Sequence, residues 1–165
     1  MNLAEQTKKI LEILDDDFPL NRLGLILQNK DMILEWLESK TFKEKYTKHP
    51  YPPLVDPSKV LWEQTDPNVA WDLNLPLPPF YSLLFSVLPG AGGSAFYKFL
   101  KLCGVDCYSK WYGHHLAYLE NYQIFSQSQN YKALFVTDFI NPNAKKFWSL
   151  IDKKIPMIYF SRGCS

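Results

Sequence analysis

The residues best suited to binding an anion lie within the segment PGAGGSAF, residues 89–96. Gly90, Gly92 and Gly93 are three of the seven glycines of the chain. Because glycine has no side chain, it lets backbone N–H groups turn inward and lets a phosphate approach the backbone closely. Ser94 adds a hydroxyl donor. The segment therefore predicts either a phosphate-binding loop or an ordinary strand-to-helix turn rich in glycine.

The segments on either side of this loop predict a strand before it and a helix after it. Residues 80–88 read FYSLLFSVL, a short apolar run that is typical of a strand buried on both faces. Residues 94–104 read SAFYKFLKLCG and have helical spacing, with Gly104 at the position of a C-cap glycine. A helix N-terminus adds N–H donors and positive partial charge. The loop is therefore expected at the carboxyl end of a strand, where open α/β sheets bind ligands.

Three later segments continue the alternation of strands and helices. Residues 131–139, YKALFVTDF, and residues 155–162, IPMIYFSR, predict two more strands. Residues 141–154, NPNAKKFWSLIDKK, predict a helix between them, with Lys145 and Lys146 on its solvated face. Strands that alternate with helices favour a parallel sheet with right-handed crossovers. The predicted fold class is therefore α/β.

We divide the chain into three regions. Residues 1–48 carry short apolar stripes at helical spacing and predict two or three helices, either a packing module or a dimerisation element. Residues 49–79 hold eight of the twelve prolines, and we interpret them as a proline-rich arm on the domain surface with Trp62 and Trp71 docked. Residues 80–165 form the partial α/β domain.

The loop lacks two common nucleotide-binding motifs. It has no Gly-Lys-Ser/Thr ending, as a Walker A motif requires, and it lacks the G-x-G-x-x-G spacing of the dinucleotide fingerprint. It resembles instead the 5′-phosphosulfate loop of sulfotransferases, whose pattern is Pro-Lys/Arg-Ser/Ala-Gly-Thr-Ser/Thr-x-Leu. The matching places are occupied by Pro89, Ala91, Gly92, Ser94 and Phe96. In the same family a later strand ends in an arginine, and Arg162 ends the strand predicted here.

The resemblance implies a partial parallel sheet of a P-loop, sulfotransferase-like fold. It also implies transfer of a sulfuryl group from 3′-phosphoadenosine-5′-phosphosulfate to a hydroxyl, for which a glycan is one candidate acceptor. The 5′-phosphosulfate would lie in a cradle formed by Gly90, Ala91, Gly92, Gly93 and Ser94. Arg162 would bind the 3′-phosphate of the nucleotide.

The resemblance also implies a general base for the acceptor hydroxyl, with a pKa near the working pH. His114 and His115 are the first candidates, and Glu120 is the reserve. The alternative for both histidines is a structural or surface role. Asp138 follows the second predicted strand and could act in catalysis, although capping the next turn is the simpler role.

The chain departs from the sulfotransferase pattern in ways that predict a weakened or inactive enzyme. Gly90 stands where the family has a lysine or arginine that stabilises the leaving phosphate. The sequence stops three residues after Arg162, so we expect the N-terminal part of a larger fold and a shortened reading frame. The composition also resembles that of a paralogous protein family of Campylobacter-type bacteria. The alternatives are a non-catalytic binding module and a different nucleotide-sugar or phosphate-group transferase.

Composition limits the partners and the compartment. The net charge of +1 predicts no general attraction to nucleic acid or to an anionic membrane, and no window is apolar enough for a membrane span. The three cysteines lack the spacing of a zinc site, so we expect no metal, and we interpret Cys107 as structural. An odd number of cysteines favours reduced thiols and a cytoplasmic protein. The oligomeric state stays open.

Overall fold

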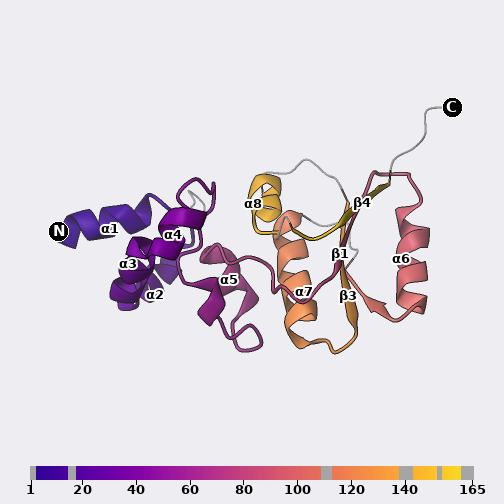
Figure 1. The fold of residues 1–165 in the computed structure, drawn as a ribbon, viewed down its shortest axis with the longest axis horizontal. Helices are drawn as coiled ribbons and strands as arrows, with labels where there is room; N and C mark the ends of the chain where they lie inside the picture. The colour runs from indigo at the N-terminus through magenta and orange to yellow at the C-terminus, as the bar shows by residue number, and fades with distance from the viewer. Residues whose placement is uncertain (1–2, 15–17, 109–112, 138–142, 152–153, 161–165) are drawn as a thin grey trace.

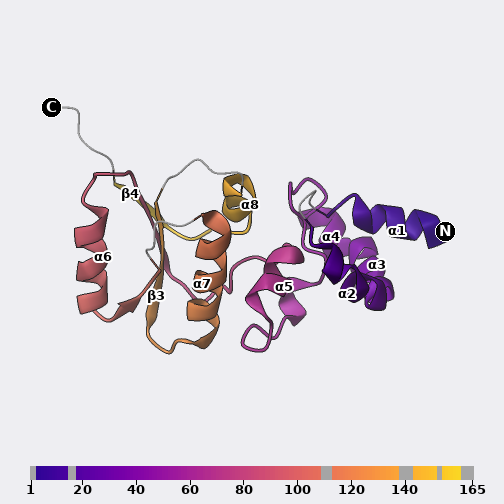
Figure 2. The same ribbon diagram turned by 180° about the vertical axis from the view of Figure 1, so that it is seen from behind.

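The computed structural model of the chain describes residues 3–14, 18–108, 113–137, 143–151 and 154–160. It is an α/β structure with a four-stranded parallel sheet, which confirms the fold class predicted from the sequence. Figure 1 and Figure 2 show a group of small helices at one end of the molecule and the sheet with its helices at the other, with helix α5 between them.

The group of small helices begins the chain and has its own core. Its elements are α1 (Leu3–Leu11), the 3-10 helix η1 (Leu20–Arg22), α2 (Leu23–Gln28), α3 (Lys30–Glu38) and α4 (Lys40–Lys45). Apolar side chains of these helices, among them Ile10, Ile33 and Leu37, pack together with Leu54. Because each helix is short, burial of this apolar face rather than intrinsic helix propensity stabilises the group.

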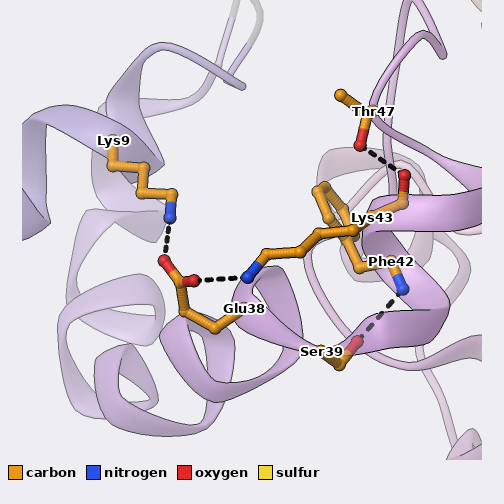
Figure 3. Close-up of polar contacts among 6 residues, drawn as sticks. All are labelled: Lys9, Glu38, Ser39, Phe42, Lys43 and Thr47. Carbon is orange, nitrogen blue, oxygen red and sulfur yellow. Dashed lines mark hydrogen bonds and ion pairs between the residues drawn. The ribbon is translucent and has the colours of Figure 1, made fainter.

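Polar contacts hold α1, α3 and α4 together at the surface (Figure 3). The Glu38 carboxylate accepts hydrogen bonds from the ammonium groups of Lys9, on α1, and Lys43, on α4. These two lysines lower the pKa of Glu38 to about 2. The hydroxyl of Ser39 accepts a hydrogen bond from the N–H of Phe42 at 3.1 Å and so caps the N-terminus of α4.

The proline-rich segment contains two short helices. They are the 3-10 helix η2 (Pro57–Lys59) and α5 (Pro67–Asp72). Proline occupies the first turn of each, where its missing N–H costs nothing, and an aspartate caps each N-terminus. The Asp66 carboxylate accepts hydrogen bonds from the N–H groups of Asn68 and Val69, at 2.9 and 3.1 Å.

This segment is more deeply buried than an arm on the domain surface would be, while Trp62 and Trp71 pack on the core as predicted. Leu54 and Leu75 are completely buried, and Leu77 and Trp71 nearly so. The segment lies between the small helices and the sheet domain, with Leu54, Leu75 and Leu77 buried and carbonyl groups that accept side-chain donors. The indole N–H of Trp36 on α3 donates to the carbonyl of Pro53 at 2.9 Å.

The sheet has the strand order β2-β3-β1-β4, and all its strands are parallel. The strands are β1 (Leu83–Val87), β2 (Val105–Asp106), β3 (Tyr131–Thr137) and β4 (Met157–Phe160), and the helices between them are α6 (Gly93–Leu102), α7 (His114–Gln127) and α8 (Ala144–Ser149). The three strands predicted from the sequence are present. Strand β2 was not predicted, because two residues give no periodic signal.

Helices cover both faces of the sheet (Figure 1). Helix α6 lies on one face, and α7 and α8 lie on the other. Alternate residues of β1 point to opposite faces, so that Phe85 and Val87 join the core under α6 while Leu84 joins the core with α7 and α8. Strand β4 is an edge strand beside β1, which leaves Met157 and Tyr159 exposed. None of the described helices is both long and apolar enough to cross a membrane.

Candidate functional site

The glycine-rich loop joins β1 to α6 at the carboxyl edge of the sheet. Gly90 and Gly92 have positive φ angles, 78° and 83°, which non-glycine residues rarely adopt. The N–H of Ala91 closes the turn by donating to the carbonyl of Leu88 at 3.1 Å. The carbonyl of Gly92 then accepts the first helical hydrogen bonds, from Ala95 and Phe96, both at 3.1 Å. The sequence segment thus forms the strand, loop and helix that its pattern predicted.

The loop presents a row of backbone donors at the start of α6. Among the described residues, the N–H groups of Gly92, Gly93 and Ser94 and the Ser94 hydroxyl have no hydrogen-bond partner. Gly92 and Ser94 are exposed. Unpaired N–H groups at a helix N-terminus carry positive partial charge and favour an anion. The loop therefore has the geometry of an anion-binding site.

Aromatic packing fixes the start of α6 against the sheet. The ring of Phe96 lies 5.0 Å from that of Phe85 on β1 and 4.7 Å from that of Phe160 on β4. Phe96 is the apolar residue that completes the loop motif in the sequence. This packing holds the first turn of the helix at the edge of the sheet, so the N–H donors of the loop are preorganised.

Gly93 has a different role from the other two glycines of the loop. Its φ is not positive, but a Cβ built at this position would lie 2.8 Å from Cγ1 of Val87. Val87 is buried at the end of β1 and has a stiff, β-branched side chain. A glycine is required here because the first turn of α6 packs directly on the end of the strand. At Gly92 a Cβ would meet nothing within 4 Å, and the backbone angle alone requires glycine.

We predict that Gly93→Ala lowers the free energy of unfolding by about 1–3 kcal/mol, because the added methyl group overlaps Val87. Urea denaturation measures the change. Gly24→Ala is the matched control, since a Cβ at Gly24 in α2 meets nothing within 4 Å, and it is expected to stabilise by about 0.5–1 kcal/mol. In the Gly93→Ala background, Val87→Ala should lower the free energy of unfolding by less than it does in the unaltered chain. If the losses of the two variants simply add, this packing is contradicted.

The sheet topology places the loop where α/β proteins bind ligands. Strands β1 and β3 are neighbours, but the helix that follows β1 lies on one face of the sheet and the helix that follows β3 lies on the other. The carboxyl ends of two such strands diverge into a crevice, which is the usual ligand site of open α/β sheets. The loop at residues 88–92 follows β1 and therefore lies on one side of this crevice. Asp138, which follows β3, lies outside the described residues.

The glycine-rich loop, residues 88–94, carries no basic side chain of its own. Gly90 supplies no charge, and Arg162 lies outside the described residues. Strand β4 ends beside the start of the loop, because Phe160 pairs with Val87. Lys98 is exposed on α6, four residues after Ser94 and hence on the same side of the helix. Helical side chains lean toward the N-terminus, so Lys98 is the described cation best placed to reach the loop.

The candidate bases begin α7, on the face of the sheet opposite to α6. Because α7 runs antiparallel to the strands, its first turn lies at the carboxyl edge of the sheet. His114 is buried, with its ring 5.2 Å from that of Phe147. His115 is half-buried, with its ring 4.9 Å from that of Trp71. Glu120 is exposed, more than a turn further along the helix. The structure thus places the two histidines at the carboxyl edge of the sheet but not in the loop.

His115 belongs to a second polar site that the sequence analysis missed. A cavity of about 140 Å³ is lined by Phe18, Pro19, Trp71, Asp72, His115, Asn143 and Lys146. These residues come from the segment just before η1, from α5, from α7 and from the start of α8. The Nε2 atom of His115 is buried and has no hydrogen-bond partner among the described residues. No local motif could have predicted this site, because its residues are far apart in the sequence.

Asp72, one of the residues that line this cavity, forms an ion pair with Arg22. The Nε of Arg22 lies 2.6 Å from Oδ2 of Asp72, whose side chain is only 10% exposed. Burial raises the pKa of Asp72, and Arg22, Lys146 and His115 oppose that rise in decreasing order. Burial likewise lowers the pKa of His115, against the attraction of Asp72. The imidazole is therefore favoured in its neutral form.

Lys146 does not lie on a solvated helix face, which corrects our prediction. It is 4% exposed, and its ammonium group lies 4.7 Å from the centroid of the Trp71 ring and 5.8 Å from that of Tyr51. Its neighbour Lys145 is exposed, as predicted. The helix presents Lys146 to α5 because one side of α8 packs against the core. Cation–π contacts with two aromatic rings offset part of the cost of burying the charge.

Cys107 is buried, and burial raises the pKa of its thiol to about 11. The described residues contain no group of three or more metal-binding side chains.

We predict that iodoacetamide at pH 8 modifies the exposed Cys103 and leaves Cys107 intact, since only about a thousandth of a thiol with a pKa of about 11 is ionised at this pH. Mass spectrometry of a Cys164→Ser background measures both sites, and urea should expose Cys107. Equal modification rates in the folded protein would contradict a buried thiol.

Comparisons of the chain with protein-family models, with curated proteins and with solved structures found no match.

Proposed function

We propose that the loop at residues 88–94 binds the 5′-phosphosulfate or phosphate of an adenine nucleotide, and that the chain has a sulfotransferase-like function. The observation that supports this proposal is the row of unpaired N–H groups at Gly92, Gly93 and Ser94. They lie at the carboxyl edge of a parallel sheet, where β1 and β3 diverge. The resemblance of the loop to the 5′-phosphosulfate motif supports the choice of nucleotide.

The residues of the loop fit an anionic group. Two positive φ angles, at Gly90 and Gly92, are backbone conformations of the kind found in anion-binding nests. The Ser94 hydroxyl would add a hydrogen bond from the first turn of α6. In this scheme Arg162 binds the 3′-phosphate, and Lys98 supplies charge near the 5′ group in place of the residue missing at Gly90. When bound, 3′-phosphoadenosine-5′-phosphosulfate would supply the sulfuryl group for transfer to a hydroxyl.

The second candidate function is nucleotide binding without transfer. Gly90 favours it, because a loop without its own cation stabilises developing charge poorly. The placement of the candidate bases also favours it. His114 packs on Phe147, and His115 lines the separate cavity, so neither projects from the loop itself.

Calorimetric titration with 3′-phosphoadenosine-5′-phosphate tests the binding proposal. We expect saturable binding that weakens about tenfold in Ser94→Ala and in Arg162→Ala, since each variant removes a hydrogen bond to a charged group. Ser82→Ala is the matched control, because Ser82 is exposed and precedes β1 at the opposite edge of the sheet. Adenosine 5′-monophosphate should bind more weakly and should be insensitive to Arg162→Ala. No binding to the folded chain would refute the proposal.

Transfer is measured separately, with labelled 3′-phosphoadenosine-5′-phosphosulfate and a panel of phenols and sugars. Label transfer that is lost in Ser94→Ala would support the sulfotransferase-like function. Binding of the nucleotide without transfer to any acceptor would support the second candidate. His115→Gln separates the possible roles of this histidine. If His115 is the catalytic base, the variant should lose transfer while its nucleotide binding stays unchanged.

A further inference from the structure

The cavity around His115 is a built site and not a packing defect. Its walls combine a nearly buried ammonium, a buried imidazole nitrogen, a carboxylate and two aromatic rings. Buried polar groups are normally satisfied by a partner, and the Nε2 atom of His115 has none among the described residues. A ligand that accepts or donates a hydrogen bond at this atom would remove that deficit.

The charges around the cavity favour an anion. The Nε of Arg22 lies 2.6 Å from Oδ2 of Asp72, so the positive charge of Arg22 offsets part of the negative charge of Asp72. Lys146 contributes a positive charge, and burial favours the neutral form of His115. Because an ammonium has three N–H donors, Lys146 can donate to a ligand while keeping its other contacts. A bound cation would meet Lys146 in a partly dehydrated cavity, where like charges repel strongly.

The size and the apolar walls of the cavity define the rest of the ligand. Trp71 lies at the centre of the site, with the His115 ring and the Lys146 ammonium each within 5 Å of its ring centroid. Phe18 and Pro19 add apolar surface from the segment just before η1. A cavity of about 150 Å³ is known to hold a benzene molecule. The cavity of about 140 Å³ therefore suits a flat group of similar size.

We propose that this cavity binds a small organic carboxylate, with its planar or short apolar part against Trp71 and its carboxylate against Lys146 and His115. This inference goes beyond the proposed function, because none of these residues belongs to the glycine loop. A ligand at this position would contact the segment just before η1, α5 and α7 together, so its binding would tighten the contact between the two ends of the molecule.

Three probes of nearly the same shape test which ligand charge the cavity prefers: the anionic benzoate, the neutral benzamide and the cationic benzamidine. Imidazole resonances of the three histidines are followed by NMR, with His115→Gln used to assign His115. We expect benzoate to shift the His115 resonances saturably with a Kd on the order of 1 mM, as its size permits. His49, whose Nε2 lies 3.0 Å from the carbonyl oxygen of Ser149, should not shift. Benzamide should bind about tenfold more weakly, and benzamidine should not bind.

Lys146→Met and Lys145→Met form a matched pair, since the two lysines are neighbours on α8 and only one faces the cavity. Benzoate binding should weaken at least about tenfold in Lys146→Met and stay unchanged in Lys145→Met. It should also stay unchanged in Ser94→Ala, because the glycine loop is a separate site. If Lys146→Met does not fold, the comparison of the three probes on the unaltered chain decides the question.

Equal affinity for the three probes, preference for benzamidine or the absence of any saturable shift at His115 would each overturn the proposal. Benzoate binding that survives in folded Lys146→Met, or that disappears in Ser94→Ala, would also overturn it. Because the loop and the cavity are tested with different ligands and different variants, failure at one site is distinguishable from failure at the other.

Discussion

Trp71→Ala is expected to lower the free energy of unfolding by about 3–5 kcal/mol, the usual cost of truncating a buried tryptophan. Trp71 is 7% exposed, and its ring lies 5.1 Å from that of Tyr118 in an edge-on contact. The same ring contacts His115 and Lys146. The truncation would therefore leave a large cavity and would also remove the cation–π partner of a nearly buried lysine.

Urea denaturation followed by circular dichroism measures this loss. Phe99→Ala is the control, because Phe99 is an aromatic residue on α6 that is 58% exposed, and truncations at exposed positions usually cost little. A loss below about 1 kcal/mol in Trp71→Ala would contradict the central position of this ring. If the variant does not fold, Trp71→Phe keeps an aromatic ring and should cost less than the alanine variant would.

Arg22→Met is expected to cost about 3 kcal/mol at pH 7, because it leaves the carboxylate of Asp72 without its partner in a nearly buried position. Methionine keeps the apolar stem of arginine, so the effect of charge is separated from the effect of packing. The expected cost lies at the lower end for buried ion pairs, since the Arg22 side chain is 27% exposed. Chemical denaturation at several pH values measures the loss.

The pH dependence of this loss follows from the pKa of Asp72. Burial raises that pKa in the folded protein, and removing Arg22 would raise it further. Between the ordinary carboxyl pKa and the raised value, the folded state holds a proton that the unfolded state has released. Stability therefore falls as the pH rises through this window. The cost of Arg22→Met should be largest at pH 7 and should shrink as the pH falls and Asp72 becomes protonated.

The double variant Arg22→Met/Asp72→Asn tests the cause directly. It removes both charges, so most of the stability lost in Arg22→Met should return. A double variant as unstable as Arg22→Met alone would show that the ion pair is not the source of the loss. Lys40→Met is a suitable control, because Lys40 and its partner Glu44 form an exposed pair at 3.7 Å and such pairs contribute little.

The sequence alone determined three of the four strands of the sheet domain and its helices α6 and α8. Apolar runs bounded by prolines or polar residues predicted β1, β3 and β4, because strands buried in a parallel sheet need side chains that are apolar on both faces. Helical spacing after the loop predicted α6. Gly104 follows this helix with a φ of 75°, a conformation that favours glycine, so this one residue marked the end of the helix in the sequence. These signals are local, and local patterns are readable from one chain.

The sequence also located the loop, but it did not distinguish the roles of its glycines. Gly90 and Gly92 adopt positive φ angles, whereas Gly93 is needed for its contact with Val87. The first role belongs to the backbone of the loop itself. The second depends on how α6 docks on the strand, and that contact exists only after the helix has packed.

Only the tertiary structure decided the order of the strands, the buried position of the proline-rich segment and the cavity around His115. Arg22, Asp72, His115 and Lys146 come from four different elements, and no spacing in the sequence relates them. The sequence placed Lys146 on a solvated face because lysine is rarely buried. Its burial depends on the aromatic rings of Tyr51 and Trp71, which chain folding brings beside it from distant segments. Contacts between distant residues create the chemistry of this site, and a pattern within one segment does not contain them.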